Sequence, residues 1–189
     1  MELKVENLTK RYGGRTVLDG VSFTLREGVT CLMAPSGAGK TTLLRLLRGL
    51  EKADGGQITG LAGRRISAVF QEDRLLPGLD AAGNLRFVLG ADCDEGRAAE
   101  LLGELGLSDV GDKAVRDYSG GMRRRLALAR ALLFPCDILL LDEPFTGLDP
   151  ENRRRAAACV RRHGAGKIVF VVTHEASDAE ALEAEILRL

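Results

Sequence analysis

The sequence predicts an α/β fold with a mostly parallel central sheet, on three observations. Two continuous apolar runs, residues 138–141 and 168–172, have the length of strands buried on both faces. Segments with helical periodicity separate these runs, so strands alternate with helices along the chain. A glycine-rich loop also joins a short apolar run, 29–33, to a helical segment. The 189 residues are enough for a single domain, 1–189, with a substantial core.

The first part of the chain is expected to form a small antiparallel β-subdomain. Apolar residues alternate at Leu3 and Val5, and again from residue 21 to residue 25, as they do in half-buried strands. The glycines between these strands predict a turn, and residues 54–56, Asp-Gly-Gly, predict a second turn. Residues 66–70 then predict a strand that ends just before Gln71.

The residue pattern changes after this strand. β-Branched residues become scarce, while Ala98, Leu101, Leu102 and Leu105 recur at helical spacing. We therefore expect a mostly helical subdomain over about 72–119, inserted into an α/β core made of 1–71 and 120–189. The core elements expected after it are a helix at 123–133, a strand at 137–141, a helix at 151–162 and a strand at 168–172.

Composition excludes some classes of partner. Lys+Arg and Asp+Glu number 27 each, so the net charge is zero and no global field favours nucleic acid or anionic lipid. We expect no nucleic-acid partner. Arginine clusters at 123–125, 153–155 and 161–162 are interpreted as solvated helix faces.

The sequence also indicates a cytoplasmic setting. No apolar run approaches the roughly 20 residues that span a bilayer, and the N-terminus lacks the layout of a signal peptide. Cys31, Cys93, Cys136 and Cys159 are scattered, with no Cys-x-x-Cys pair. They are interpreted as small buried residues of a reducing compartment rather than as a disulfide or zinc site.

Residues 34–42 form a candidate phosphate-binding loop. Its glycines allow backbone N–H groups to close around phosphates, and the following helix N-terminus adds a positive dipole end. A plain glycine turn before a core helix is the alternative. Ala34 stands where the usual pattern has glycine, and it fits if its φ is negative. The residues expected to bind nucleotide are Pro35, Ser36, Gly37, Ala38, Gly39, Lys40, Thr41 and Thr42.

Two carboxylates, Asp142 and Glu143, follow the apolar run at 138–141. Ligands of open α/β sheets bind at the carboxyl ends of the strands, where these side chains emerge. Neighbouring strand residues point to opposite sides, so the two carboxylates can take different roles. Asp142 is expected to hold Mg²⁺ with Thr41, while Glu143 polarises the attacking water. An ordinary turn is the alternative.

The tetrad Ser119, Gly120, Gly121 and Met122 precedes a helix rich in Leu, Ala and Arg. Serine is a good N-cap, and simple helix capping would explain it. Capping does not explain the two glycines, which let a helix end approach a phosphate closely. One chain cannot easily present this second helix end to its own bound γ-phosphate.

The order of these motifs resembles the ATP-binding-cassette (ABC) ATPases, a family of P-loop NTPases, and the resemblance covers essentially the whole chain. It implies that two chains pack head to tail, with ATP and Mg²⁺ at the interface. Each chain's signature, Ser119 to Met122, would then close the other chain's site. Met122 stands where glutamine is commoner in the family.

Further positions match family motifs, and their roles are implied by the resemblance. Gln71 matches the glutamine that senses Mg²⁺, water and the transporter interface, and Asp149 ends a Gly-Leu-Asp loop that couples the two sites. His174 matches the histidine that contacts the γ-phosphate, and Tyr12 matches the aromatic residue that stacks on adenine. The implied catalytic set is Lys40, Gln71, Glu143 and His174, and the implied metal set is Thr41, Gln71 and Asp142.

The resemblance implies the ATPase subunit of a membrane transporter, at the cytoplasmic face of the membrane. Its partners would be a second copy or a closely related chain, a permease docked near Gln71 and the helical subdomain, and, in an importer, indirectly a solute-binding protein. Residues 69–77 resemble importer ATPases of the nitrate, sulfonate and taurine group. A soluble ABC ATPase of DNA repair or translation, and a regulatory module that no longer hydrolyses ATP, are the alternatives.

Two departures from the family affect these expectations. The stretch between the loop and Gln71 is short, so we expect a reduced β-subdomain. Few residues follow His174, so we expect no regulatory C-terminal domain, and the last strand, 185–189, is expected to be cut short.

Overall fold

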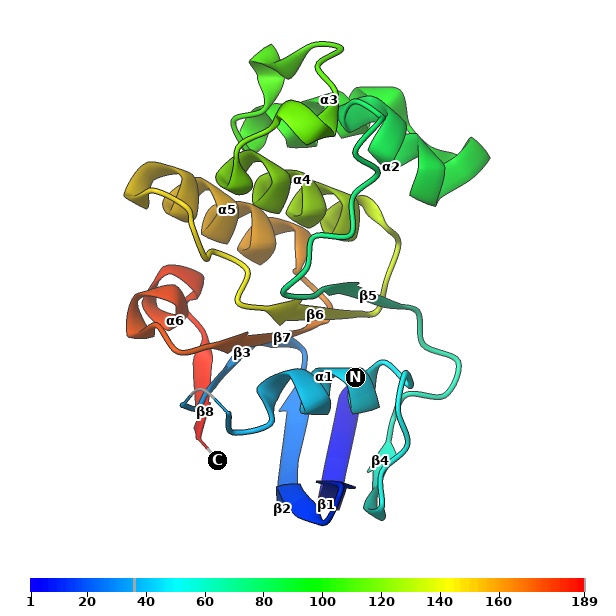
Figure 1. Cartoon of the computed structure of the whole chain (residues 1–189), viewed down its shortest axis with the longest axis vertical. Helices are drawn as coiled ribbons and strands as arrows, with labels where there is room; N and C mark the ends of the chain where they lie inside the picture. Colours follow the sequence, from blue (N-terminus) through cyan, green and yellow to red (C-terminus); the bar gives the residue numbers. More distant parts are fainter. Residues whose placement is uncertain (36, 189) are drawn as a thin grey trace.

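Two sheets organise the chain in the computed structural model, which describes residues 1–35 and 37–188 (Figure 1). The larger sheet is parallel, in the order β5 (Ile66–Val69), β6 (Ile138–Asp142), β7 (Ile168–Thr173), β3 (Gly28–Met33) and β8 (Glu185–Arg188). The smaller sheet is antiparallel, in the order β2 (Arg15–Arg26), β1 (Glu2–Tyr12) and β4 (Gly55–Thr59). The predicted parallel core and N-terminal antiparallel subdomain are both confirmed.

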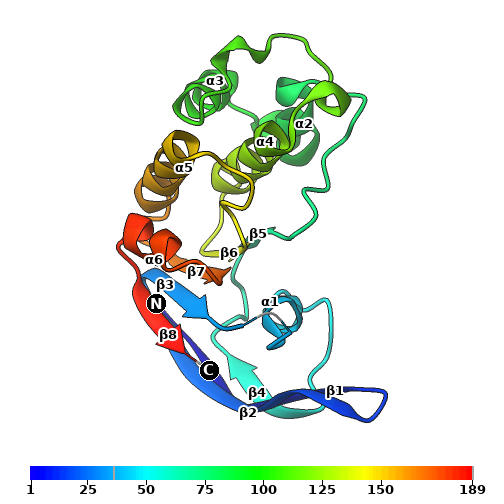
Figure 2. The same ribbon diagram turned by 60° about the vertical axis from the view of Figure 1, so that its left-hand side comes forward.

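The two central strands are buried along their whole length and divide the core in two. Leu139, Leu141 and Val171 join one apolar cluster, while Ile138 and Leu140 join the other. This alternation follows from the two-residue period of a strand, and it explains why the runs are continuously apolar. Helix α1 (Lys40–Leu47) lies on one side of the sheet, and α4 (Gly120–Leu133) and α5 (Pro150–His163) lie on the other (Figure 2).

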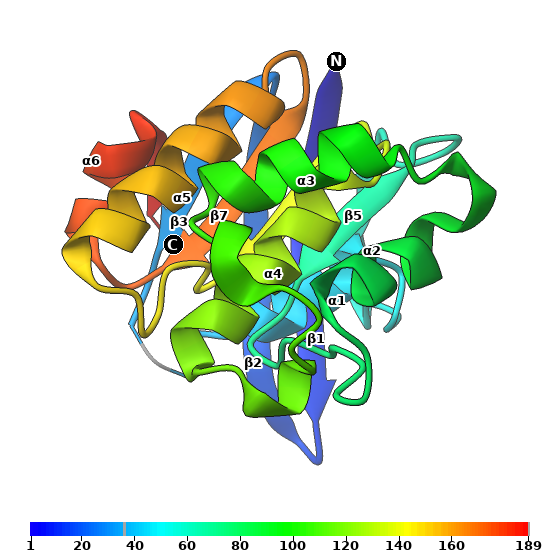
Figure 3. The same ribbon diagram turned by 90° about the horizontal axis from the view of Figure 1, so that it is seen from above.

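Helices fill the chain between β5 and α4. They are α2 (Ala81–Leu89) and α3 (Glu95–Glu104), with 3₁₀ turns at Gly90–Asp92, Ser108–Val110 and Val115–Asp117. Figure 3 looks down on this layer, where α3 lies over α4 and α2 lies beside it. The four apolar residues at helical spacing, Ala98, Leu101, Leu102 and Leu105, are all buried. Packing against α4, rather than intrinsic propensity, therefore holds this region.

The last part of the chain returns to the core and differs slightly from the predicted bounds. Helix α4 begins at Gly120 rather than at residue 123, because the Ser119 side chain accepts a hydrogen bond from the Met122 N–H at 3.2 Å. Helix α5 begins at Pro150, because Asp149 caps it. Helix α6 (Ala176–Leu182) connects β7 to β8.

The predicted turn at 54–56 is wrong in part, because Gly55 and Gly56 belong to strand β4. Gly56 has a φ of 77°, and a Cβ on it would lie 2.3 Å from the Asn7 carbonyl oxygen. The glycine therefore permits a close approach of two backbones beside an irregularity in β1, not a reversal of the chain.

Two other expectations concern the whole chain. Cys31, Cys136 and Cys159 are buried and Cys93 is partly buried, and all four carry free thiols. Across residues 1–35 and 37–188, no helix combines the length and the apolar character needed to cross a membrane.

Candidate active site

The glycine loop lies where β3 meets α1, at the carboxyl edge of the parallel sheet. A cavity of about 420 Å³ opens there, lined by Val17, Gly37, Gly39, Lys40, Thr41, Thr42, Gln71, Asp142 and Glu143. The Lys40 ammonium is buried and donates to the Ala34 carbonyl at 2.7 Å and to the Pro35 carbonyl at 3.4 Å. Ser36, also predicted to bind nucleotide, lies outside the described residues.

Gly39 is the position in this loop where glycine is required. Its φ is 82°, and a Cβ would lie 2.8 Å from a Leu18 methyl and 2.9 Å from the Val17 carbonyl oxygen. Strand β2 therefore presses directly on the loop. Ala34 is not among the non-glycine residues of positive φ, which in the described chain are Asn7, Arg74, Glu143 and Glu183. Alanine is thus tolerated at the first loop position without backbone strain.

Asp142 and Thr41 meet on one wall of this cavity. The Thr41 hydroxyl donates to the Asp142 carboxylate at 2.9 Å. Burial raises the pKa of Asp142, and the Thr41 hydrogen bond acts in the opposite direction. Among the described residues, no cluster of three or more His, Cys, Asp or Glu side chains could hold a metal. A hydroxyl, a carboxylate and the nearby Gln71 amide are nevertheless oxygen donors, which suit Mg²⁺ completed by substrate phosphates and water.

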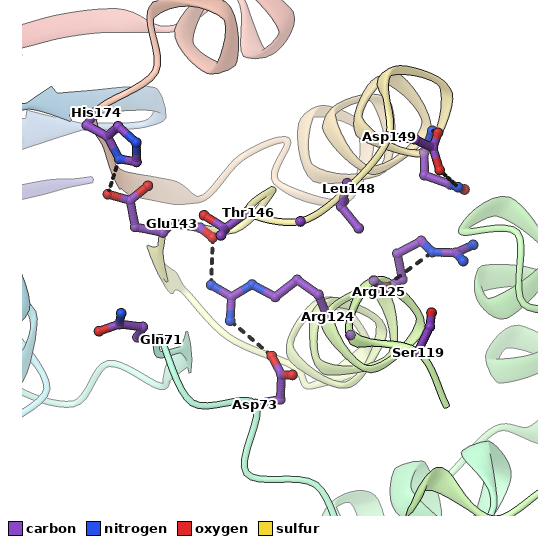
Figure 4. Close-up of a pocket in the computed structure, with 14 residues that line it drawn as sticks. Gln71, Asp73, Ser119, Arg124, Arg125, Glu143, Thr146, Leu148, Asp149 and His174 are labelled. Atoms are coloured by element: carbon purple, nitrogen blue, oxygen red, sulfur yellow. Dashed lines mark hydrogen bonds and ion pairs between the residues drawn. The ribbon is translucent and has the colours of Figure 1, made fainter. Parts of the chain in front are cut away.

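Glu143 stands at the centre of the charged groups. One carboxylate oxygen, Oε1, lies 2.8 Å from His174 Nδ1 (Figure 4). The same oxygen lies 3.7 Å from Lys40 Nζ. The other, Oε2, is buried and finds no hydrogen-bond partner within residues 1–35 and 37–188. A buried carboxylate oxygen without a partner is costly, so this atom indicates a place for a ligand or a water.

The backbone of Glu143 is held in an uncommon conformation. Its φ is 49°, in the left-handed region that non-glycine residues seldom adopt. Its N–H donates to the Val172 carbonyl at 2.8 Å, which continues the pairing of β6 with β7. Such strain persists where the surroundings over-determine the conformation, and it is concentrated at functional sites.

His174 is carried by a turn that its neighbours fix. Thr173, the last residue of β7, donates its hydroxyl to Asp178 at 2.7 Å and accepts the Glu175 N–H at 3.1 Å. These bonds place the imidazole beside Glu143 although His174 itself is exposed. The hydrogen bond to Glu143, followed by its charge, raises the pKa of His174 above its ordinary value of 6.5.

The signature residues line a second cavity. Ser119, Gly120 and Gly121 border a space of about 690 Å³, together with residues that include Glu143, Asp149 and His174. Ser119 lies across this space from His174 and Gln71 (Figure 4). Asp149 uses its carboxylate to accept the Glu151 and Asn152 N–H groups, which caps α5 and lowers its pKa. The fold thus brings Gln71, Asp142 and Glu143 to the loop cavity, with His174 bonded to Glu143. It places the signature on the second cavity.

Met122 and Tyr12 lie outside both cavities. The Met122 side chain packs against the main apolar cluster, and only its N–H serves Ser119. Tyr12 ends β1, is 44% exposed and donates its hydroxyl to Glu51. The Lys10 ammonium lies over its ring, 5.2 Å from the centroid. The ring is therefore an anchored aromatic surface that is open to solvent.

Arg124 and Arg125 are functional candidates that the sequence pattern does not reveal. The prediction that residues 123–125 form a solvated helix face is wrong for these two arginines, because both are buried. Arg125 donates to the Leu105 and Gly106 carbonyls at 2.7 Å each. Arg124 donates to the carbonyls of Phe70, Asp142 and Glu143. A run of three arginines gives no local sign of this, because the acceptors come from distant segments of the chain.

The sequence is similar to known ATP-binding subunits. The family described as ABC transporter matches residues 18–146. The aliphatic sulfonates import ATP-binding protein SsuB 2 of Paraburkholderia xenovorans is 43% identical over 194 residues, which cover 99% of this chain and 76% of that protein.

Relatives of other names are nearly as similar. The probable sulfate/thiosulfate import ATP-binding protein CysA of Chlorella vulgaris is 38% identical, over 100% of this chain and 87% of its own length. The Nod factor export ATP-binding protein I of Ralstonia nicotianae is 42% identical, over 95% of this chain and 61% of its own length.

Proposed function

This chain belongs to the ABC transporter family as an ATP-binding and ATP-hydrolysing subunit, and we propose that it works as half of a head-to-tail dimer with two shared ATP sites. The position of Glu143 is the strongest support for this function. Its carboxylate reaches both Lys40 and His174, and its second oxygen is buried without a partner in the described chain. A general base beside a phosphate-binding loop has this arrangement.

The triphosphate would lie in the loop cavity, against the backbone N–H groups at the start of α1. Lys40 would leave its loop carbonyls to bridge the β- and γ-phosphates, since charged acceptors bind an ammonium more strongly than neutral ones. His174, whose pKa is raised, would donate to a γ-phosphate oxygen. Tyr12 would stack on the adenine.

Thr41, Asp142 and Gln71 would hold Mg²⁺. Bound there, the ion would neutralise charge on the phosphate oxygens. Glu143 Oε2 would accept a hydrogen bond from the attacking water and take its proton. The water oxygen then forms a bond to the γ-phosphorus, the bond from that phosphorus to the ADP oxygen breaks, and phosphate leaves. Positioning and charge stabilisation supply most of the catalysis, since little covalent chemistry falls to the protein.

A second chain is needed because the signature does not line the loop cavity of its own chain. Ser119, Gly120 and Gly121 border the other cavity, at the N-terminus of a 14-residue helix. In the dimer that helix end would face the γ-phosphate held by the partner, where its N–H groups and dipole stabilise negative charge.

The permease would dock beside Gln71 and the helical subdomain. Phe87 is 70% exposed on α2, and Val88 next to it borders a groove that continues to Phe70 and Arg74. Large exposed apolar side chains of this kind mark interaction surfaces. The names of the relatives, mostly importers, support a peripheral position at the cytoplasmic face of a membrane. Relatives named for aliphatic sulfonates support an importer of that group, served indirectly by a solute-binding protein.

The substitution Glu143→Gln tests the catalytic assignment. It keeps the size of the side chain and removes the base, so turnover should fall about 10²- to 10⁴-fold while ATP binding survives. The closed dimer should then accumulate with ATP and be visible by size-exclusion chromatography. Steady-state hydrolysis at the wild-type rate by Glu143→Gln would remove Glu143 from this role.

A further inference from the structure

We propose that Arg124 couples the two ATP sites of the dimer, as a positioning residue that ties the signature helix to the backbone of Glu143. The inference rests on the proposed function, because it needs a chain that contributes to two sites at once. Ser119 and its glycines would serve the partner's nucleotide, while Glu143 serves the chain's own. Arg124 lies on α4, the helix that begins at the signature, and donates a hydrogen bond to the Glu143 carbonyl.

The contacts of Arg124 converge on the carboxyl ends of two strands. The residue is 5% exposed. One guanidinium nitrogen donates to the carbonyls of Asp142 and Glu143, the latter at 2.7 Å. The other donates to the Phe70 carbonyl at 2.6 Å and pairs with Asp73 at 3.1 Å. The guanidinium thus bridges the segments on both sides of Gln71 and the segment that contains Glu143 (Figure 4).

This network begins little more than one helical turn from the start of the signature. Arg124 lies five positions after Ser119, a rise of about 7.5 Å along a stiff helix. A phosphate that draws the N-terminus of α4 toward the partner's site therefore also displaces the guanidinium. The planar fork transmits this movement to two successive carbonyls, which a flexible lysine cannot do.

Glu143 is well suited to respond to such a displacement. Its backbone has a φ of 49°, which neighbouring contacts must maintain. The Arg124 bond to its carbonyl is one of these contacts, and the Val172 bond to its N–H is another. If the Arg124 guanidinium moves relative to the Val172 carbonyl, the backbone of Glu143 rotates. The Glu143 carboxylate would then move relative to His174 and Lys40.

Arg130 supplies a matched control from the same helix. It donates to the Asp73 carbonyl at 2.8 Å and to the Arg74 carbonyl at 2.7 Å. Arg130 therefore ties the same loop to the same helix, but both of its acceptors are loop carbonyls. If holding the loop were sufficient, Arg124→Gln and Arg130→Gln would have the same effect.

The test measures steady-state ATPase activity against ATP concentration, with Mg²⁺, on the full chain at dimer-forming concentrations. Wild-type protein should give a Hill coefficient well above one, since two coupled sites allow up to two. Arg124→Gln should lower it to one and reduce kcat about 10-fold, while ATP binding to dilute monomer stays within about twofold. Arg124→Lys should behave like Arg124→Gln, and Arg130→Gln like wild type.

A folded Arg124→Gln protein with an unchanged Hill coefficient and kcat would overturn the inference, and so would a wild-type dimer without cooperativity. A wild-type chain that shows no hydrolysis, or a fully active Glu143→Gln, would instead refute the proposed function. If thermal melting shows that Arg124→Gln does not fold, Asp73→Asn serves in its place. It frees the guanidinium from one anchor, so a lower Hill coefficient supports the inference and an unchanged one contradicts it.

Discussion

The proposed site has a loop half, made of Lys40, Thr41, Asp142 and Glu143, and a signature half, made of residues 119–121. The two halves are built in opposite ways within one chain. The loop half is rich in charge and is organised by its own chain, with Lys40 and Asp142 buried and Thr41 bonded to Asp142. In the signature half, Ser119 and Gly120 are exposed, and the Ser119 hydroxyl is occupied in capping its own helix. In the proposed dimer, the loop half would therefore bind nucleotide by itself. The signature half would bind a phosphate only when another chain brings one to it.

The substitution Gly120→Asp should break the signature half without disturbing the monomer. A Cβ at this position has no atom within 4 Å, so a side chain fits in the isolated chain. An added carboxylate would repel the partner's γ-phosphate, and turnover should fall about 10³-fold. ATP binding to dilute monomer should stay unchanged. Isothermal titration and a phosphate-release assay measure the two quantities.

Mixing two inactive variants then tests whether the halves are shared between chains. Lys40→Ala breaks only the loop half and Gly120→Asp only the signature half, so one intact site forms in a mixed dimer. In an equimolar mixture, half of the dimers contain one chain of each variant, and each of these dimers has one intact site of two. The mixture should therefore recover up to about a quarter of wild-type activity. A mixture as inactive as its components would show that both halves act within one chain.

Much of the loop half could be predicted, because its residues are neighbours in the sequence or directly follow an apolar strand. Lys40, Thr41, Asp142 and Glu143 meet as expected. The buried arginines could not be found in this way. Besides the Asp73 carboxylate, the partners of Arg124 are backbone carbonyls at the ends of two strands, and a carbonyl acceptor leaves no mark on the sequence.

In the β-subdomain, too, a contact between distant segments could not be predicted from the local sequence. Gly55 and Gly56 indicated a turn by composition, but Gly56 is there because strand β1 passes too close for a Cβ. Local propensity cannot reveal an approach between segments that only the tertiary fold brings together.

The substitution Tyr12→Ala should weaken the binding of ATP by the loop half. Removing the ring takes away a stacking surface, so the monomer's affinity for ATP should fall about 10-fold. Affinity for inorganic tripolyphosphate, which has no base, should stay unchanged when measured by the same titration. Equal losses for both ligands would mean that Tyr12 supports the loop rather than the adenine.

The smallest expected effect is on the pH dependence of stability, to which His174 and His163 contribute in opposite directions. His174 has its pKa raised by Glu143, while burial and then Arg162 lower the pKa of His163. Because its pKa is raised in the folded state, His174 stabilises the fold below pH 6.5, and this stabilisation is lost as the pH rises through the folded-state pKa. Because its pKa is lowered, His163 contributes stability above pH 6.5, and this contribution is lost as the pH falls through the folded-state pKa. NMR titration should show the two imidazoles on opposite sides of 6.5, and Glu143→Gln should lower only the pKa of His174.

In the proposed dimer, each site takes its loop from one chain and its signature from another. The hydrolysis rate per chain, measured over a dilution series while sedimentation reports the fraction of dimer, tests this sharing. We expect the rate to follow the dimer fraction and to vanish for monomer that still binds ATP. Demonstrably monomeric protein that hydrolyses ATP at the full rate would contradict it.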